Sequence, residues 1–315
     1  MALVSSIKLA GGAAAALAVV ALAGCGSTPA HRSGGAVASR ALDAATSSAL
    51  SSSFKANVSG WVRLGLEKVS GLPSTTQEQL TRLQQQLNSS TLVGSLEFQS
   101  PADFEGSYSF APALPAPVDV IEVGGVRYVS VNGAGWHEVP ATPPGGKAAR
   151  WSGGMAPALG SLAGLVRSAS AVSTLPPTSL DGQVVDHLRA RIPGAALARI
   201  LTRALSSGAV RGGGADIQAL VSLLNFQPAT LDSFIAKSTG LPVRESARGG
   251  FSFNLAALGL LGSAGVPQAR GTVALTFEFT VTFSGYGSHF AITKPSQLVP
   301  GPPPAPGSPA LSSLF

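Results

Sequence analysis

Strict alternation of apolar with small or polar side chains over residues 272–284 (TVALTFEFTVTFS) constrains the fold of this chain most strongly. A period of two places the apolar positions on one face of a β-strand, whereas a helix would distribute them all round. At about 3.3 Å per residue such a strand is roughly 40 Å long, which predicts a large, twisted sheet with one apolar face. The apolar positions are Val273, Leu275, Phe277, Phe279, Val281 and Phe283.

An apolar face of this length has to be covered, and two covers fit the sequence. Packed helices would make the face an ordinary core, whereas an apolar ligand would occupy a cavity under the sheet. Residues 54–64 show the same alternation, which predicts a second strand with Val58, Val62 and Leu64 on one face. We therefore expect these three residues, together with the six apolar residues of 272–284, to line either the core or the cavity.

The first 24 residues predict an export signal, because Lys8 precedes an apolar segment at residues 9–22 and small residues follow. Residues 22–25 (LAGC) resemble the bacterial lipobox, in which the chain is cut before the cysteine and the sulfur receives diacylglycerol. Cys25 is the only cysteine, which excludes a disulfide within the chain. The mature protein is therefore expected to begin at Cys25 on the extracytoplasmic face of the cell membrane, anchored by its lipid chains.

Three regions are expected in the mature chain. Residues 25–39 are small and polar and predict a flexible tether. Residues 40–297 predict a single folded domain. The Pro-rich residues 298–315 are too poor in core residues to fold and predict a disordered tail.

Helical and strand periodicities alternate along the domain and predict an α+β fold, a broad antiparallel sheet with a few helices on one side. The polar insert at residues 65–91 predicts a short surface helix or lid, with Thr75 and Glu78 at capping-box spacing. Gly249 and Gly250 predict a break in the strand that contains them, and residues 112–117 predict a Pro-rich bend. Helices are expected at residues 40–53, 155–166 and 195–205, and strands at 54–64, 92–99, 103–110, 119–123, 126–131, 184–192, 230–236, 241–255 and 272–284.

Motifs that carry chemistry are missing from the sequence. It contains no Gly-x-Ser-x-Gly turn, no Gly-x-Gly-x-x-Gly and no Walker loop, and its four histidines are isolated from one another. Asp186 and His187 are adjacent on an expected strand, so they point to opposite faces and cannot act on each other. The formal charge of +6 comes from singly scattered Lys and Arg. We therefore expect no enzyme activity, no metal, no cofactor and no nucleic-acid partner.

Four segments in order resemble the mycobacterial LppX/LprG group of lipoproteins (LppX_LprAFG), relatives of the LolA and LolB lipoprotein carriers. They are residues 120–136 (VIEVGGVRYVSVNGAGW), 180–193 (LDGQVVDHLRARIP), 234–244 (FIAKSTGLPVR) and 279–295 (FTVTFSGYGSHFAITKP). The resemblance implies a large curved antiparallel sheet, a half-open barrel wrapped around helices. It also implies a hydrophobic cavity that takes acyl chains of membrane lipids and glycolipids, and no catalytic residues.

Together these features predict a membrane-anchored lipoprotein that binds acyl chains of lipid or glycolipid as a carrier or chaperone in the cell envelope. Its expected partners are the membrane, a lipid or glycolipid ligand and an envelope transporter. The alternative is a lipoprotein with a packed core that acts by binding another envelope protein. Abundant Ala and Gly, with more Arg than Lys, fit an actinobacterial source.

Overall fold

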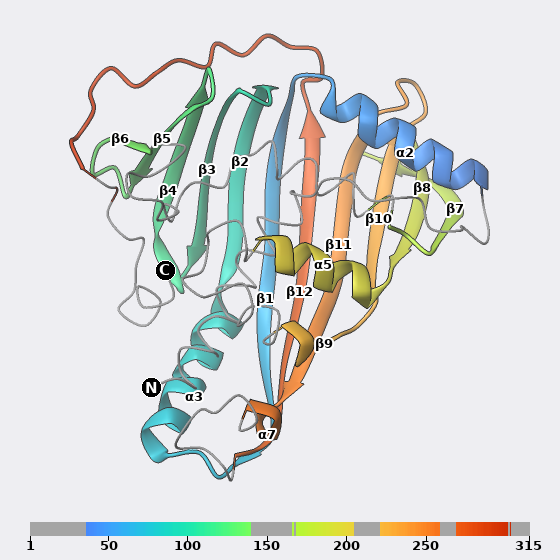
Figure 1. The fold of residues 1–315 in the computed structure, drawn as a ribbon. Helices are drawn as coiled ribbons and strands as arrows, with labels where there is room; N and C mark the ends of the chain where they lie inside the picture. The colour runs from blue at the N-terminus through green and yellow to red at the C-terminus, as the bar shows by residue number, and fades with distance from the viewer. Residues whose placement is uncertain are drawn as a thin grey trace.

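A single open antiparallel sheet dominates the computed structural model, which describes residues 36–139, 166, 168–204, 221–258, 269–301 and 303. Twelve strands of the described chain form it, in the order β6-β5-β4-β3-β2-β1-β12-β11-β10-β8-β7, and β9 pairs with β11 (Figure 1). The strands are β1 (Phe54–Ser70), β2 (Thr91–Ser100), β3 (Asp103–Ala111), β4 (Leu114–Val123), β5 (Val126–Val131), β6 (His137–Val139), β7 (Ala171–Leu180), β8 (Gln183–Ile192), β9 (Asn225–Phe226), β10 (Ala229–Ala236), β11 (Pro242–Asn254) and β12 (Arg270–Ser284).

The two longest strands, β1 and β12, pair at the centre of the sheet, which joins the beginning and the end of the domain. Val58 lies opposite Val281, and Leu64 lies opposite Leu275. The expected strands at residues 54–64 and 272–284 are both confirmed, although β1 continues to Ser70. Antiparallel pairing across the centre explains the length of both strands, since the backbone groups of each strand hydrogen-bond those of the other.

Helices lie on one face of the sheet, which we call the inner face; the opposite face is the outer face (Figure 1). The helices are α2 (Ala36–Leu50), α3 (Ser74–Ser89), α5 (Gly194–Ala204) and α7 (Leu255–Leu258). In α2 the buried residues are small apart from Leu42, and the helix contacts β7 and β11. The expected α+β class with helices on one side is therefore confirmed.

The polar insert contains a helix, α3, that packs against the sheet. Leu80, Leu83 and Leu87 follow helical spacing and are buried, each stabilising the fold by about 1.5–3 kcal/mol. The Asn88 side chain also bonds both backbone groups of Leu64, accepting from its N–H at 2.7 Å and donating to its carbonyl at 3.1 Å. These bonds fix the end of α3 against β1.

Local signals were wrong at several positions. Pro73 precedes α3 without a side-chain cap, so Thr75 and Glu78 do not form a capping box. The strand β11 continues through Gly249 and Gly250, and β4 begins at Leu114 within the expected bend. β7 was not expected from the sequence because it contains two prolines, which are tolerated at a sheet edge. The expected helix at residues 155–166 lies outside the described residues except Val166.

After β12 the chain runs along one rim of the sheet to β6 (Figure 1). Val299 N–H donates to the Trp136 carbonyl at 2.7 Å, and His137 Nδ1 lies 3.0 Å from the Gly301 carbonyl oxygen. Leu298 forms an isolated parallel bridge with Trp136. The first residues of the segment that the sequence assigns to the tail therefore contact the β6 edge.

Candidate functional site

The nine residues expected to line a core or cavity all lie on the inner face. Cross-strand pairing aligns Val58 with Val281, Val62 with Phe277, and Leu64 with Leu275. Directly opposed side chains on one face of a sheet contact each other, so β1 and β12 form one continuous apolar surface. Its other members are Val273, Phe279 and Phe283.

Most of this surface is covered by side chains of the protein itself. Six residues belong to one buried cluster with the leucines of α3 and with Phe251 and Phe253 of β11. Phe283 belongs to a second cluster of aromatic residues. Val58 and Val281 are half-buried between the two clusters. The six residues of the first cluster are Val62, Leu64, Val273, Leu275, Phe277 and Phe279.

Two glycines allow aromatic rings to approach the backbone closely on this face. A Cβ added to Gly60 of β1 would overlap Cδ1 of Phe279, and one added to Gly249 of β11 would lie 3.0 Å from Cζ of Phe277. The rings of Phe277 and Phe279 are stacked, with centroids 5.5 Å apart. Gly249 is therefore needed for close approach of a ring, which is why it does not interrupt the strand.

The second cluster is built around Phe54. Its ring stacks on Phe98 at a centroid distance of 4.8 Å and meets Phe283 edge-on at 5.6 Å. Tyr286, from the rim segment after β12, packs against Phe54 and Phe283. These rings form an apolar wall beside Val281.

A half-buried area remains between the two clusters, and we call it the central patch: Val58, Gly94, Gly106, Tyr108, Val120 and Val281. Pairing places Val58 between Val281 and Gly94, and Gly94 opposite Tyr108. Gly94 and Gly106 leave two inner-face positions without side chains. Val58 and Val281 are the two residues of the predicted lining that are not fully buried.

Polar groups also lie on the inner face, near the hairpin of β4 and β5. Arg127 donates to Oε2 of Glu122 from Nε at 3.1 Å and from Nη2 at 2.6 Å, and both side chains are 11% exposed. Burial raises the pKa of Tyr108 to about 12, although the positive charge of Arg127 opposes the increase. His137 is buried beside them on β6. The apolar surface therefore has an ionic border on this side.

Glu245 of β11 is a buried carboxyl on the inner face that sequence reasoning missed. It lies opposite Val281 on β12 and Ser233 on β10. The Ser233 hydroxyl donates to its Oε1 at 3.3 Å, and burial raises the pKa of Glu245 to about 7. The sequence did contain a signal: Glu245 follows the same period of two as Phe251 and Phe253, which places it on the same face of the strand.

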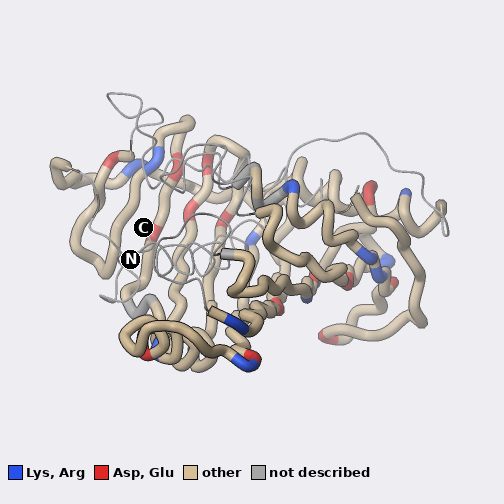
Figure 2. Tube along the Cα trace, turned by 60° about the horizontal axis from the view of Figure 1, so that its bottom comes forward, with Lys and Arg blue, Asp and Glu red and all other residues tan. Residues whose placement is uncertain are grey.

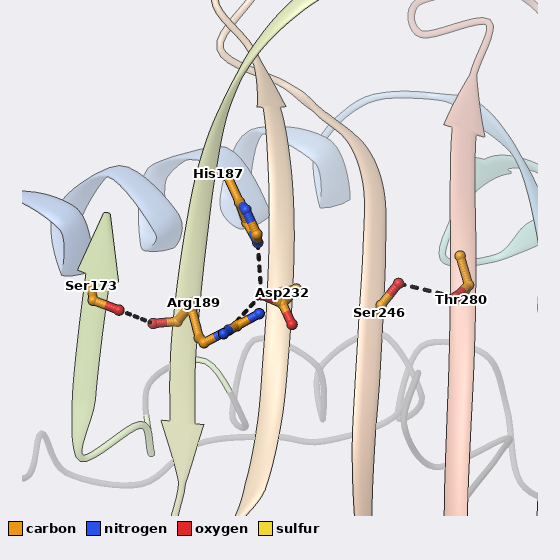
Figure 3. Close-up of polar contacts among 6 residues, drawn as sticks. All are labelled: Ser173, His187, Arg189, Asp232, Ser246 and Thr280. Atoms are coloured by element: carbon orange, nitrogen blue, oxygen red, sulfur yellow. Dashed lines mark hydrogen bonds and ion pairs between the residues drawn. The ribbon is translucent and has the colours of Figure 1, made fainter. Parts of the chain in front are cut away.

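Asp186 and His187 do not interact with each other, as adjacency on a strand predicts. Asp232 Oδ1 accepts hydrogen bonds from His187 Nε2 at 2.7 Å and Arg189 Nε at 2.8 Å (Figure 3). Asp186 instead pairs with Lys237 at 3.2 Å. Asp232 lies opposite Ser246, on the outer face. The side chains of His187, Arg189 and Asp232 therefore join β8 to β10. Two neighbouring serines form other hydrogen bonds, Ser173 with the Arg189 carbonyl and Ser246 with the Thr280 hydroxyl (Figure 3).

Charged residues of both signs are dispersed along the described chain (Figure 2). Among the described residues, no group of three or more His, Cys, Asp or Glu is placed to hold a metal ion. No described helix is long and apolar enough to cross a membrane. Cys25 lies outside the described residues.

No protein-family model matches the chain, and no curated protein matches it. Solved structures to which it is similar include the lipoprotein LprF of Mycobacterium bovis, with 13% identity over 86% of this chain and 100% of that chain, and a TM-score of 0.39. The lipoprotein LppX of Mycobacterium tuberculosis is similar with 12% identity over 81% and 98% of the two chains, and a TM-score of 0.35. Both belong to the group that the four sequence segments resemble. The MucA/MucB complex of Pseudomonas aeruginosa contains a chain similar at 11% identity over 86% and 68%, with a TM-score of 0.34.

Proposed function

We propose that this protein is a membrane-anchored lipoprotein that binds acyl chains of a lipid or glycolipid on the inner face of its sheet. It acts as a carrier or chaperone that shields acyl chains from water in the cell envelope. The ligand contacts the central patch and the aromatic wall beside it. Anchoring is through lipid chains on Cys25, and the function requires no catalytic residue or cofactor.

One observation carries the proposal: Val58 and Val281 stay half-buried at the centre of the sheet, whereas the other seven predicted lining residues are buried. The residues on either side are already covered by α3 or by aromatic rings. Apolar surface in the middle of a sheet is costly to leave in water, so an apolar ligand would stabilise it.

The energy of acyl transfer is sufficient for tight binding. Burying a sixteen-carbon chain contributes on the order of 10 kcal/mol at about 0.8 kcal/mol per methylene, before the costs of ordering. A ligand of this kind is expected to remain bound during purification.

The second candidate is a lipoprotein that binds another envelope protein. It is supported by the six expected lining residues that pack against α3 and β11, since their burial needs no ligand. In this case the central patch would accept a side chain of the partner protein.

Mass spectrometry of organic extracts tests the two candidates. The chain from residue 25 onward, carrying Cys25→Ser so that it has no lipid of its own, is purified without detergent. Co-purified acyl lipid, replaced on addition of a fluorescent acyl probe, is the expected result. A lipid-free protein that also fails to bind the probe would favour the protein-binding candidate.

A further inference from the structure

We propose that Glu245 is the polar anchor of the acyl site, and that it hydrogen-bonds the carbonyl oxygen of an esterified acyl chain lying on the central patch. The inference rests on the proposed function and names the class of ligand: neutral acyl esters rather than plain hydrocarbons or anionic head groups.

The position of Glu245 places its carboxyl at the border of the central patch. Glu245 and Val281 are direct cross-strand partners, and Val281 in turn is the partner of Val58. Side chains of such partners on one face have Cβ atoms about 4.5–5.5 Å apart. A chain that lies across Val58 and Val281 therefore ends beside the Glu245 carboxyl.

The carboxyl has hydrogen-bonding capacity to spare. Within the described chain its single hydrogen bond comes from Ser233, and at 3.3 Å this bond is longer than the usual 2.7–2.8 Å of an O–H···O bond. The nearby Tyr286 hydroxyl donates to the Pro242 carbonyl at 2.8 Å instead. A carboxyl group can form further hydrogen bonds beside this one, and a ligand carbonyl would be such a partner.

The surroundings of Glu245 favour its neutral form. On the inner face its neighbours are Val281 and Ser233, and no cation of the described residues pairs with it. The helices packed against this face carry Arg40 and Asp43 on α2, Arg199 on α5, and Glu78 and Arg82 on α3, and all of these except Asp43 are exposed. The titratable group that acts on Glu245 from the rim segment is Tyr286, which is not basic. Burial raises its pKa to about 7. A protonated carboxyl carries one O–H donor, which suits an ester carbonyl, whereas a carboxylate would repel an anionic head group.

A matched pair of fluorescent probes tests the anchor: the methyl ester of pyrenedodecanoic acid and dodecylpyrene, which lacks the ester. Binding of both to the Cys25→Ser chain from residue 25 is measured at pH 6 and pH 8.5. For the wild-type site we expect the ester-to-hydrocarbon affinity ratio to be about five- to tenfold higher at pH 6 than at pH 8.5, the effect of one hydrogen bond. Glu245→Leu should show the low ratio at both pH values.

Glu245→Gln separates the hydrogen bond from mere shape, because its amide N–H donates at every pH. At pH 8.5 this variant should still prefer the ester probe, whereas the wild type, whose carboxyl is then deprotonated, should not. The control is Glu278→Gln, which removes a carboxylate on the outer face of the adjacent strand, 4.0 Å from Arg248. It should behave as the wild type.

The outcomes distinguish this inference from the proposed function. If both probes bind but the ester ratio is the same in wild type, Glu245→Leu and Glu245→Gln, the anchor is wrong and acyl binding stands. If neither probe binds the wild-type chain, the proposed function fails and the anchor fails with it.

Discussion

Phe279 of β12 lies across Gly60 of β1, its cross-strand partner, so that the ring occupies the place where a side chain of residue 60 would begin. A Cβ at Gly60 would also lie 2.5 Å from the backbone carbonyl oxygen of Glu278, which cannot move without disturbing the central strand pair. The close approach of ring to backbone is therefore a condition for packing the inner face.

Gly60→Ala should destabilise the protein by about 1–3 kcal/mol, because the added methyl group displaces Phe279 from a close-packed cluster. Chemical denaturation measures the change. Gly65→Ala is the matched control on the same strand, since its Cβ would lie 3.7 Å from the nearest atom, Cβ of Ala274. Equal destabilisation by the two variants would show that Phe279 does not rest on Gly60.

Val281→Trp tests whether the central patch contacts ligand. The new ring enters the half-buried area between the clusters, so the melting temperature without ligand should change little while acyl-probe affinity falls at least several-fold. Thr276→Trp, on the exposed outer side of the same strand, should leave binding intact. Early melting of Val281→Trp with normal probe binding would indicate that this part of the face is ordinary core.

Stability should fall as pH rises through the range in which Glu245 titrates. Its pKa is raised from the ordinary 4.5 to about 7, so the folded state holds a proton that the unfolded state has lost. The stabilising effect is complete below about pH 4.5 and is lost as pH rises through 7, which amounts to about 3 kcal/mol at about 1.4 kcal/mol per pH unit.

Urea denaturation of the wild type and of Glu245→Gln between pH 4 and pH 8 isolates this effect from other titrating groups. The stability difference between the two proteins should shift in favour of Glu245→Gln as pH rises. A difference that is constant with pH would mean that Glu245 is solvated in the folded protein.

Arg127→Met should destabilise by up to about 3–5 kcal/mol, because it leaves the Glu122 carboxylate buried without its cation. Adding Glu122→Gln should recover most of the loss. For comparison, Lys55→Ala removes the exposed ion pair with Glu97, whose side chains are 50% and 43% exposed, and should cost less than about 1 kcal/mol. Thermal melts of the four proteins would contradict the prediction if Arg127→Met were as mild as Lys55→Ala.

Cys25→Ser should release the protein from the membrane fraction or leave its signal peptide uncleaved. The expected anchor is the lipid on the sulfur, and two or more acyl chains are needed for stable attachment. Fractionation followed by immunoblotting and N-terminal sequencing measures both outcomes. A correctly cleaved variant that remained in the membrane fraction would contradict the expected lipidation.

The local periodicity of the sequence determined the strands and the side chains that share a face. Alternation at residues 54–64 and 272–284 was sufficient to predict β1, β12 and the inner-face position of all nine expected residues. It was sufficient because a period of two is a property of neighbouring residues and does not depend on what the strand contacts.

Only the tertiary structure decided what covers that face. The sequence could not show that Val62 and Phe277 are buried in one cluster with the leucines of α3 while Val58 and Val281 remain half-buried, since the cover comes from residues distant in the chain. The same reason explains why the sequence did not reveal the burial of Glu245, which depends on β10 and β12 on either side. It also explains why Gly249 was misread as a strand break. A glycine that allows the close approach of a ring and a glycine that forms a turn are identical in sequence, and only the position of the Phe277 ring distinguishes them.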